Sequence, residues 1–248
     1  MKSFTVAFSV IFCFSCTNEK LRKANEQHSK DTLIQEVEDS MSLPMEDTLK
    51  TYRGLFRIKN NMLQFKNCDN IKLNYLVMDS TGKMDELYKK MLLKSPALPY
   101  ENVYVEVKGI LEPLPGNAKK KGFDSTLIVK ETLTFEQKNY KNTCIPYDFW
   151  ALGTRPDWSL QISEKESIIA LKDFSNNRVY VFSYYAPKIV NDGYTYHSNN
   201  FANQTSIKAT FKQQQCSEDT AGNKYSYSVS VLMNGKKYNG CAINGLKN

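Results

Sequence analysis

Apolar and polar residues alternate in short runs along most of this chain, a pattern that predicts β-strands. In the first half of the chain such runs cover residues 52–58, 62–65, 73–78, 103–111 and 126–135. Between the third and fourth runs the period becomes helical, and apolar side chains spaced three and four apart predict a helix over 83–93. Three strands, one helix and two strands follow the order of an OB-type barrel, so we expect a five-stranded meander of this kind.

The second half continues with further strand-like runs but shows no convincing helix. These runs cover residues 149–153, 158–162, 168–171, 178–185, 206–211 and 225–232. Asn234-Gly235 separates two apolar stretches and predicts a two-residue hairpin turn. Trp158 alternates with Leu160 and Ile162, so its ring should point into a core. We predict an antiparallel meander or small barrel.

The N-terminus has the pattern of a secretory signal peptide. Lys2 precedes an apolar run over residues 4–14, which is too short to span a bilayer. Ser15 and Cys16 then resemble a bacterial lipobox, in which the cysteine becomes the lipidated first residue. We therefore predict a signal peptide over 1–15 and a polar, acidic, lipid-anchored tether over 16–50. An OB-like domain over 51–146 and a second β domain over 147–248 complete a mostly β protein.

Six cysteines add a constraint on the folded part of the chain. Cys13 leaves with the signal peptide and Cys16 takes the lipid. Four cysteines remain in the folded part: Cys68, Cys144, Cys216 and Cys241. An even number in an exported protein predicts two disulfides, for which three pairings are possible. The division into two domains favours Cys68 with Cys144 and Cys216 with Cys241.

The first domain resembles the OB-like domain of NlpE-type envelope lipoproteins. The resemblance lies in Phe65-Lys66-Asn67-Cys68, the strand 103–109 and Asn142-Thr143-Cys144. In that family the two cysteines bracket the barrel, which implies a bond between Cys68 and Cys144. The C-x-x-C associated with copper in the family's other domain is missing here, so copper binding is not implied.

The second domain resembles a set of envelope proteins without a settled activity. Residues 151–162 are similar to their G-T-E-P-x-W-x-L-x-I strand, although Arg155 and Asp157 depart from the pattern. The C-terminal segment 216–242, ending Gly240-Cys241-Ala242, is similar to their last hairpin. The resemblance implies a fold and no reaction.

Enzyme chemistry finds little support in the sequence. His28 falls in the tether and His197 in a predicted loop, which argues against cysteine catalysis and zinc binding. No phosphate-binding glycine loop and no G-x-S-x-G motif occur, so we expect no metal, cofactor or catalytic residue. Five carboxylates near the last barrel strand and the domain junction are open to acid/base work or to simple solvation: Asp124, Glu131, Glu136, Asp148 and Asp157.

One aromatic segment is a candidate ligand site. Between residues 178 and 203, aromatic side chains lie beside several asparagines, a combination that can stack on and hydrogen-bond a sugar or peptide. The candidate residues of this loop are Tyr184, Tyr185, Tyr194, Tyr196, His197 and Phe201. The alternative is that these rings pack in a sheet or decorate its surface.

The net charge of +7 does not identify a partner by itself. The tether is acidic and the rest of the chain is basic, with lysine clusters at 119–121 and 236–237. Nucleic acid is not an expected partner of an exported protein. We expect a non-enzymatic protein anchored by its lipid, at the outer membrane, that binds or senses an envelope protein or glycan. The alternatives are an inhibitor or adaptor of an envelope enzyme and a hydrolase with a carboxylate site.

Overall fold

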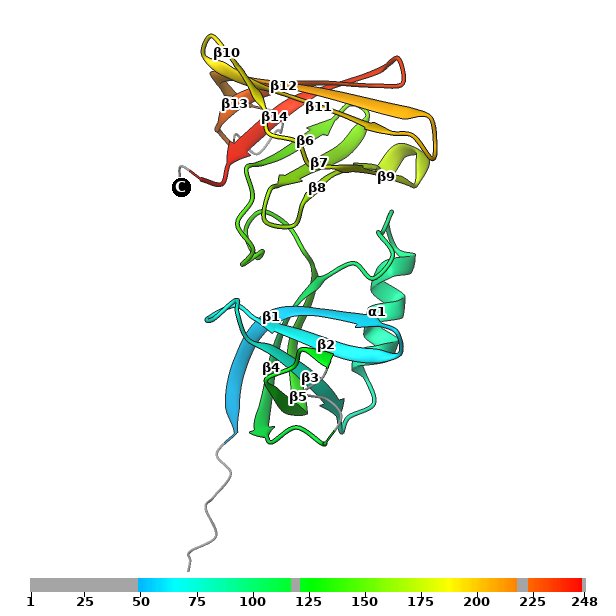
Figure 1. Cartoon of the computed structure of the whole chain (residues 1–248), viewed down its shortest axis with the longest axis vertical. Helices are drawn as coiled ribbons and strands as arrows, with labels where there is room; N and C mark the ends of the chain where they lie inside the picture. Colours follow the sequence, from blue (N-terminus) through cyan, green and yellow to red (C-terminus); the bar gives the residue numbers. More distant parts are fainter. Residues whose placement is uncertain (1–48, 117–120, 218–222, 247–248) are drawn as a thin grey trace, which may run out of the picture. The chain divides into compact units, whose positions relative to one another are not determined.

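The computed structural model describes residues 49–116, 121–217 and 223–246, and two separate β-sheets account for most of them (Figure 1). The expected mostly β fold class is confirmed. The first sheet is a closed five-stranded barrel, and the second is a curled antiparallel sheet of nine strands. The signal peptide, Cys16 and nearly all of the tether lie outside the described residues.

The barrel has the predicted order of elements. They are β1 (Lys50–Lys59), β2 (Met62–Asn67), β3 (Asn74–Asp79), α1 (Met84–Leu93), β4 (Val103–Glu112) and β5 (Ser125–Gln137). The expected meander is wrong in its pairing: the strand order is β1-β2-β3-β5-β4, and β4 also pairs with β1. After α1, β4 pairs with β1 at the far edge of the sheet. β5 then fills the gap between β3 and β4 and pairs in parallel with β3. Register shifts between β4 and β5 add the bend that closure requires.

Alternating positions of the barrel strands point into one core. Phe56 and Phe65 are almost fully buried there, and the Tyr88 ring of α1 packs edge-on against Phe56. The Asp79 carboxylate accepts from the Met84 N–H at 2.8 Å and so fixes the start of α1. The helix buries Met84 and Tyr88 and presents its charged side chains to solvent, which gives the predicted helical spacing a physical reason.

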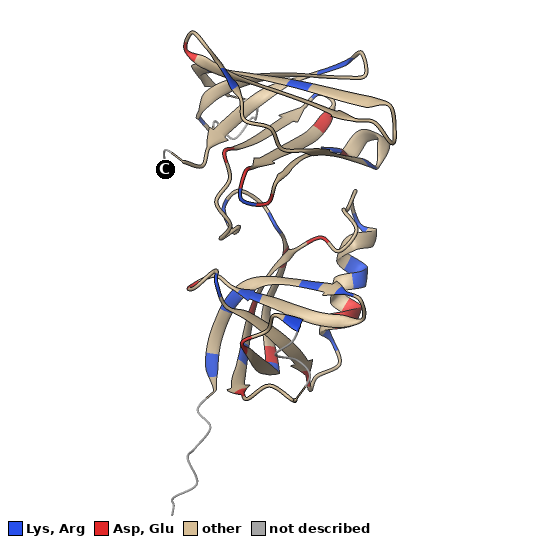
Figure 2. Cartoon of the chain, in the orientation of Figure 1, with Lys and Arg blue, Asp and Glu red and all other residues tan. Residues whose placement is uncertain are grey.

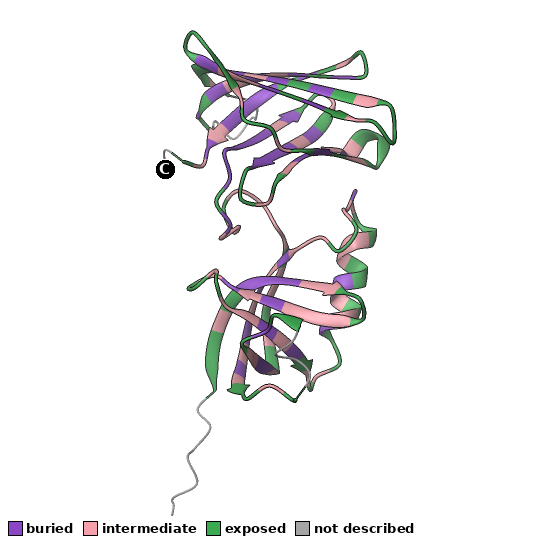
Figure 3. Ribbon diagram, viewed as in Figure 1, coloured by how far each residue is buried: buried purple, intermediate pink, exposed green. Residues whose placement is uncertain are grey.

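The second sheet contains more strands than the sequence pattern predicts. Its strands are β6 (Phe149–Thr154), β7 (Asp157–Ser163), β8 (Ile168–Asp173), β9 (Arg178–Ser183), β10 (Lys188–Val190), β11 (Gly193–Asn200), β12 (Thr205–Cys216), β13 (Tyr225–Met233) and β14 (Lys236–Asn244), with a short 3₁₀ turn at Phe174–Asn176. Their order is β10-β11-β12-β13-β14-β6-β7-β8-β9. Buried residues alternate with more exposed ones along most of β12 and along β13, whereas β6, β7 and β8 are buried at several successive positions (Figure 3).

The prediction of a loop over 184–201 is wrong, because residues 193–200 form β11. This strand pairs with β12 from Gly193 to Asn200. Tyr196 and Ser198 are buried on its inner face, while His197 between them is exposed. The strand combines β-favouring residues at 194–196 with a glycine at its start and Ser198, Asn199 and Asn200 at its end, which favour turns. Its composition is therefore ambiguous, and pairing with β12 extends the strand through the asparagines.

The predicted core position of Trp158 is confirmed. Its side chain is 1% exposed, and its indole N–H donates to the Asn239 carbonyl at 3.2 Å. The Asn234-Gly235 hairpin also forms as expected, with φ of 48° and 80° at the two turn residues. Positive φ at both positions matches the twist of the flanking strands, which is why Asn-Gly is favoured there.

The two ends of the second sheet approach each other through side chains. The Ser198 hydroxyl of β11 donates to the Ser183 carbonyl of β9 at 2.8 Å. The Asn200 amide donates to the Val181 carbonyl at 3.1 Å. We call this line of contact the β9–β11 seam. It curls the sheet without a continuous backbone ladder between those two strands.

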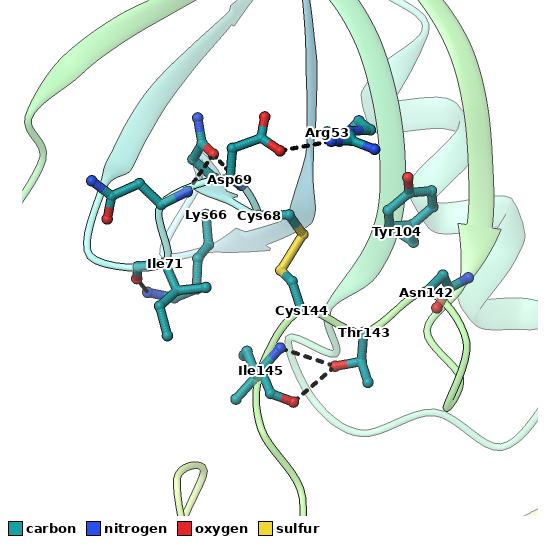
Figure 4. Close-up of a disulfide and its surroundings, with 12 residues drawn as sticks. Arg53, Lys66, Cys68, Asp69, Ile71, Tyr104, Asn142, Thr143, Cys144 and Ile145 are labelled. Atoms are coloured by element: carbon teal, nitrogen blue, oxygen red, sulfur yellow. Dashed lines mark hydrogen bonds and ion pairs between the residues drawn. A yellow bond between two sulfur atoms is a disulfide. The ribbon is translucent and has the colours of Figure 1, made fainter. Parts of the chain in front are cut away.

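Each sheet also carries one disulfide, with the predicted pairing. Cys68 is bonded to Cys144, with Cα atoms 5.2 Å apart, and this bond ties the β2–β3 turn to the segment after β5 (Figure 4). Cys216 is bonded to Cys241, with Cα atoms 5.5 Å apart, between the ends of β12 and β14. Disulfides persist in oxidising compartments, so these bonds indicate an extracytoplasmic location. Among the described residues, no helix is long and apolar enough to cross a membrane.

Candidate functional site

A hollow of about 460 Å³ lies along the β9–β11 seam. Tyr185 follows β9 and Phe201 follows β11, and both rings line the hollow. They are 58% and 85% exposed, and two exposed rings lining one hollow form an apolar patch of the kind that marks interaction sites. Asn199 and Ser183 add an amide and a hydroxyl to the same lining. None of the described residues that line the hollow is charged.

The six candidate residues fall into three groups by their surroundings. Tyr185 and Phe201 line the hollow, so the structure brings these two together as a surface site. Tyr184, Tyr194 and Tyr196 pack against the core of the second sheet instead. His197 is exposed, on the face of β11 opposite to Tyr196, and does not line the hollow. The packing alternative is therefore confirmed for Tyr184, Tyr194 and Tyr196, whereas ligand binding at Tyr185 and Phe201 stays a prediction.

The packed tyrosines converge on Asp148. The Tyr196 hydroxyl donates to its carboxylate at 3.2 Å. Burial, the Asp148 charge and the neighbouring Tyr184 raise the pKa of Tyr196 far above its usual value. Burial and a hydrogen bond to Asp148 raise the pKa of Tyr184 in the same way. Both hydroxyls stay protonated at neutral pH, so they serve as donors that satisfy a buried carboxylate.

A second buried carboxylate, Asp173, lies at the end of β8. Lys236 donates to it at 2.7 Å, and the Tyr238 hydroxyl donates at 2.9 Å. Asn176 adds its backbone and side-chain N–H groups. Burial and the bond to Asp173 raise the pKa of Tyr238 to about 12. These donors satisfy the hydrogen-bonding capacity of the buried carboxylate, so the cluster stabilises the sheet.

Four of the five carboxylates considered for acid/base chemistry engage separate partners. Asp124 accepts from the Asn74 N–H at 2.7 Å, and Glu131 pairs with Lys108 at 2.9 Å. Glu136 accepts from the Asn142 amide at 3.3 Å, and Asp148 holds the tyrosines. Within residues 49–116, 121–217 and 223–246, no group of three or more His, Cys, Asp or Glu is placed to hold a metal ion.

No family model, curated protein or solved structure matches this chain. The similarity to NlpE-type lipoproteins therefore rests on the residues quoted above and remains a prediction. The function has to be inferred from the sites themselves, because a barrel fold by itself is compatible with many activities.

The sequence analysis missed a second site, on the outer face of the barrel. A cleft there is lined on its barrel side by four cations: Arg57, Lys59, Lys66 and Lys121. Three of them come from β1 and β2, and Figure 2 shows the basic residues along β1. The signal was present as charges at alternating positions of two strands joined by a tight turn. It was overlooked because the lysines are dispersed along the chain.

Proposed function

We propose that this chain is a lipid-anchored envelope protein, held at the outer membrane through Cys16, with a non-enzymatic binding or sensing role. The signal-like segment that ends at Cys16 supports export and acylation. The pairing of all four remaining cysteines supports residence in an oxidising compartment. Several acyl chains on one cysteine would give a stable anchor, which a single chain does not.

Intact mass spectrometry of the native protein tests the anchor and the disulfides together. We expect a mass equal to residues 16–248 plus acyl groups. Reduction should add four hydrogen atoms, because two disulfides each gain two. An unprocessed chain with six free thiols would contradict both the export and the anchoring.

The hollow on the β9–β11 seam is the proposed ligand site, and a neutral carbohydrate is the ligand class. One observation carries this assignment: two highly exposed rings, Tyr185 and Phe201, flank an uncharged polar lining. Sugar rings present C–H faces that pack on aromatic side chains, and their hydroxyls suit the Asn199 amide and the Ser183 hydroxyl. A charged ligand would find no counter-charge among these residues.

An added peptide strand fits the seam less well than a sugar does. Strand addition needs free backbone groups along a sheet edge. The outward carbonyls of Val181 and Ser183 on β9 already accept from Asn200 and Ser198. A peptide would have to displace both side chains, whereas a sugar can bind above them.

Isothermal titration of the full chain with chitohexaose, a neutral N-acetylglucosamine hexamer, tests this site. Phe201→Ala and Tyr185→Ala should each weaken binding about tenfold, because each removes one stacking platform. Both side chains are largely exposed, so the melting temperature should be unchanged.

Tyr100→Ala is the matched control, since this 50% exposed ring lies outside the hollow. It should bind the hexamer like the unmodified protein. Equal loss of binding in all three variants, or no binding by the unmodified protein, would reject the neutral-sugar assignment.

A further inference from the structure

The outer face of the β1–β2 hairpin presents cations and apolar side chains together. The backbone register pairs Leu55 with Lys66, Arg57 with Gln64, and Lys59 with Met62. The alternate positions, among them Phe56 and Phe65, belong to the barrel core. Side chains alternate between the two faces of a strand, so the three pairs share the outer face. Arg57 and Lys66 are diagonal neighbours there, at roughly 7–8 Å between strands.

The hydrogen bonds of these two cations go to neutral acceptors. The Arg57 Nε–H donates to the Gln64 side-chain oxygen at 2.9 Å. The Lys66 ammonium donates to the Ile71 carbonyl at 3.0 Å (Figure 4). Burial lowers the pKa of Lys66, and the positive charge of Arg57 lowers it further. The two side chains are thus oriented by neutral neighbours, while their charges repel each other.

Three other cations of the barrel, Arg53, Lys89 and Lys108, have carboxylate partners, whereas in the described part of the chain those that line the cleft do not. Arg53 pairs with Asp69 at 2.8 Å, and Lys108 pairs with Glu131 at 2.9 Å. Among the described residues, no ion pair involves Arg57, Lys59, Lys66 or Lys121. The carboxylate of Asp124 attracts Lys66 but lies outside ion-pair distance, and the Asn74 N–H already donates to it.

The floor of the cleft between these charges is apolar. Leu55, Met62 and Phe123 line it on the barrel side, and Lys121 lies just before Phe123 in the segment that leads to β5. A ligand that fills this cleft therefore meets several positive charges around a patch of hydrocarbon. None of the four cations forms an ion pair among the described residues, although the Lys59 ammonium lies 5.9 Å from the centroid of the Tyr100 ring. The carboxylate in the lining, Glu166, is paired with Lys138. Phosphate groups carry more negative charge and more acceptor oxygens than a single carboxylate, so they suit this cleft better.

We propose that this cleft binds a ligand that carries phosphate groups next to an apolar moiety. The Arg57 guanidinium is suited to two-point contact with phosphate oxygens, and the lysines supply mobile point charges around it. The phosphate can belong to a soluble molecule or to a lipid headgroup, since both offer the same chemistry. No described residue lines both the cleft and the seam hollow, so this inference does not depend on the sugar assignment.

Binding measurements with two phosphate probes test the inference. The protein is the full chain with Cys16→Ser, which removes the acylation site and so keeps a lipid anchor from driving vesicle binding. The first probe is geranyl pyrophosphate, followed by titration calorimetry. The second is phosphatidylcholine vesicles with and without phosphatidylglycerol, followed by co-sedimentation. We expect binding to at least one phosphate probe, with an affinity that falls as salt is raised.

The double variant Arg57→Gln and Lys66→Gln should weaken that binding on the order of 30-fold, since two charge-assisted contacts are lost. The control Lys90→Gln and Lys130→Gln removes the same charge from exposed positions outside the cleft. It should change the affinity less than about threefold.

The pattern of results identifies the source of the phosphate. Binding of the soluble probe alone indicates a free ligand, and binding of the anionic vesicles alone indicates a headgroup. Equal weakening by the two double variants would show attraction to net charge only and would overturn the inference. Failure of both probes to bind the unmodified protein would overturn it as well. Titration of the Arg57→Gln, Lys66→Gln variant with chitohexaose shows separately whether the sugar site in the seam hollow is affected.

Discussion

Replacing Trp158 with alanine is expected to lower the free energy of unfolding by about 3–5 kcal/mol. The indole is 1% exposed, and its ring centroid lies 5.7 Å from that of Tyr238. Gly153 and Gly240 leave room for it, because a methyl group at either position would collide with the ring. The variant loses this packing and leaves a cavity that the neighbouring strands cannot refill.

Urea unfolding followed by circular dichroism measures this effect. Phe201→Ala is the control, since its ring is 85% exposed and its removal should leave the midpoint within error. Trp158→Phe should fall between the two, because it keeps most of the packing and loses the hydrogen bond to Asn239. A Trp158→Ala midpoint equal to that of the unmodified protein would contradict the assigned core role.

Asp173→Ala should cost about 3 kcal/mol. The carboxylate is 1% exposed and accepts from Tyr238, Lys236 and Asn176. Without Asp173, the Tyr238 hydroxyl loses its acceptor, and the Tyr238 side chain has no exposed surface from which to reach water. Lys236→Ala should cost only about 1 kcal/mol, since the lysine side chain is 41% exposed and the other donors remain.

The same carboxylate gives the protein a stability that depends on pH. Burial by itself would raise the pKa of Asp173, but hydrogen bonds from Lys236, Asn176 and Tyr238 outweigh it and lower the pKa. A lowered pKa in the folded state stabilises the protein above the unfolded value of about 3.9, and this contribution is lost as the pH falls below it.

Unfolding curves of the unmodified protein and Asp173→Ala at different pH values test this dependence. The difference in unfolding free energy should be largest above about pH 5 and should shrink toward about pH 2. Lys236→Ala should show a weaker pH dependence than the unmodified protein, since it removes one of the interactions that lower the pKa. A difference that stays constant over this range would contradict the role of an ionised Asp173.

Hydrophobic periodicity was sufficient for the elements whose burial is decided locally. The helix over Met84–Leu93 and the strand containing Trp158 buried the faces that their spacing predicts. The pairing of β5 with β3 was not predictable in this way, because register across 50 residues leaves no local signal. β11 was missed because β-favouring and turn-favouring residues are mixed along it, and its pairing with β12 decides the conformation.

The candidate sites were predictable only in part. The aromatic segment drew attention to Tyr185 and Phe201, but the sequence could not separate them from Tyr196, which faces the core. That separation depends on where β9 ends and β11 turns. Arg57 and Lys66 are nine positions apart in the sequence, and the β1–β2 register brings them to one face. Their shared site appears only once the hairpin is closed.

At the β9–β11 seam, the spacing between the two strands depends on two side chains. Ser198 and Asn200 donate hydrogen bonds to carbonyls of β9, whereas the neighbouring strands in the order of the second sheet are joined by backbone hydrogen bonds. Substitution of Ser198 or Asn200 can change the distance between β9 and β11 while the backbone hydrogen bonds between the other strands stay in place. The shape of the hollow can therefore change through these two side chains without a change in strand pairing.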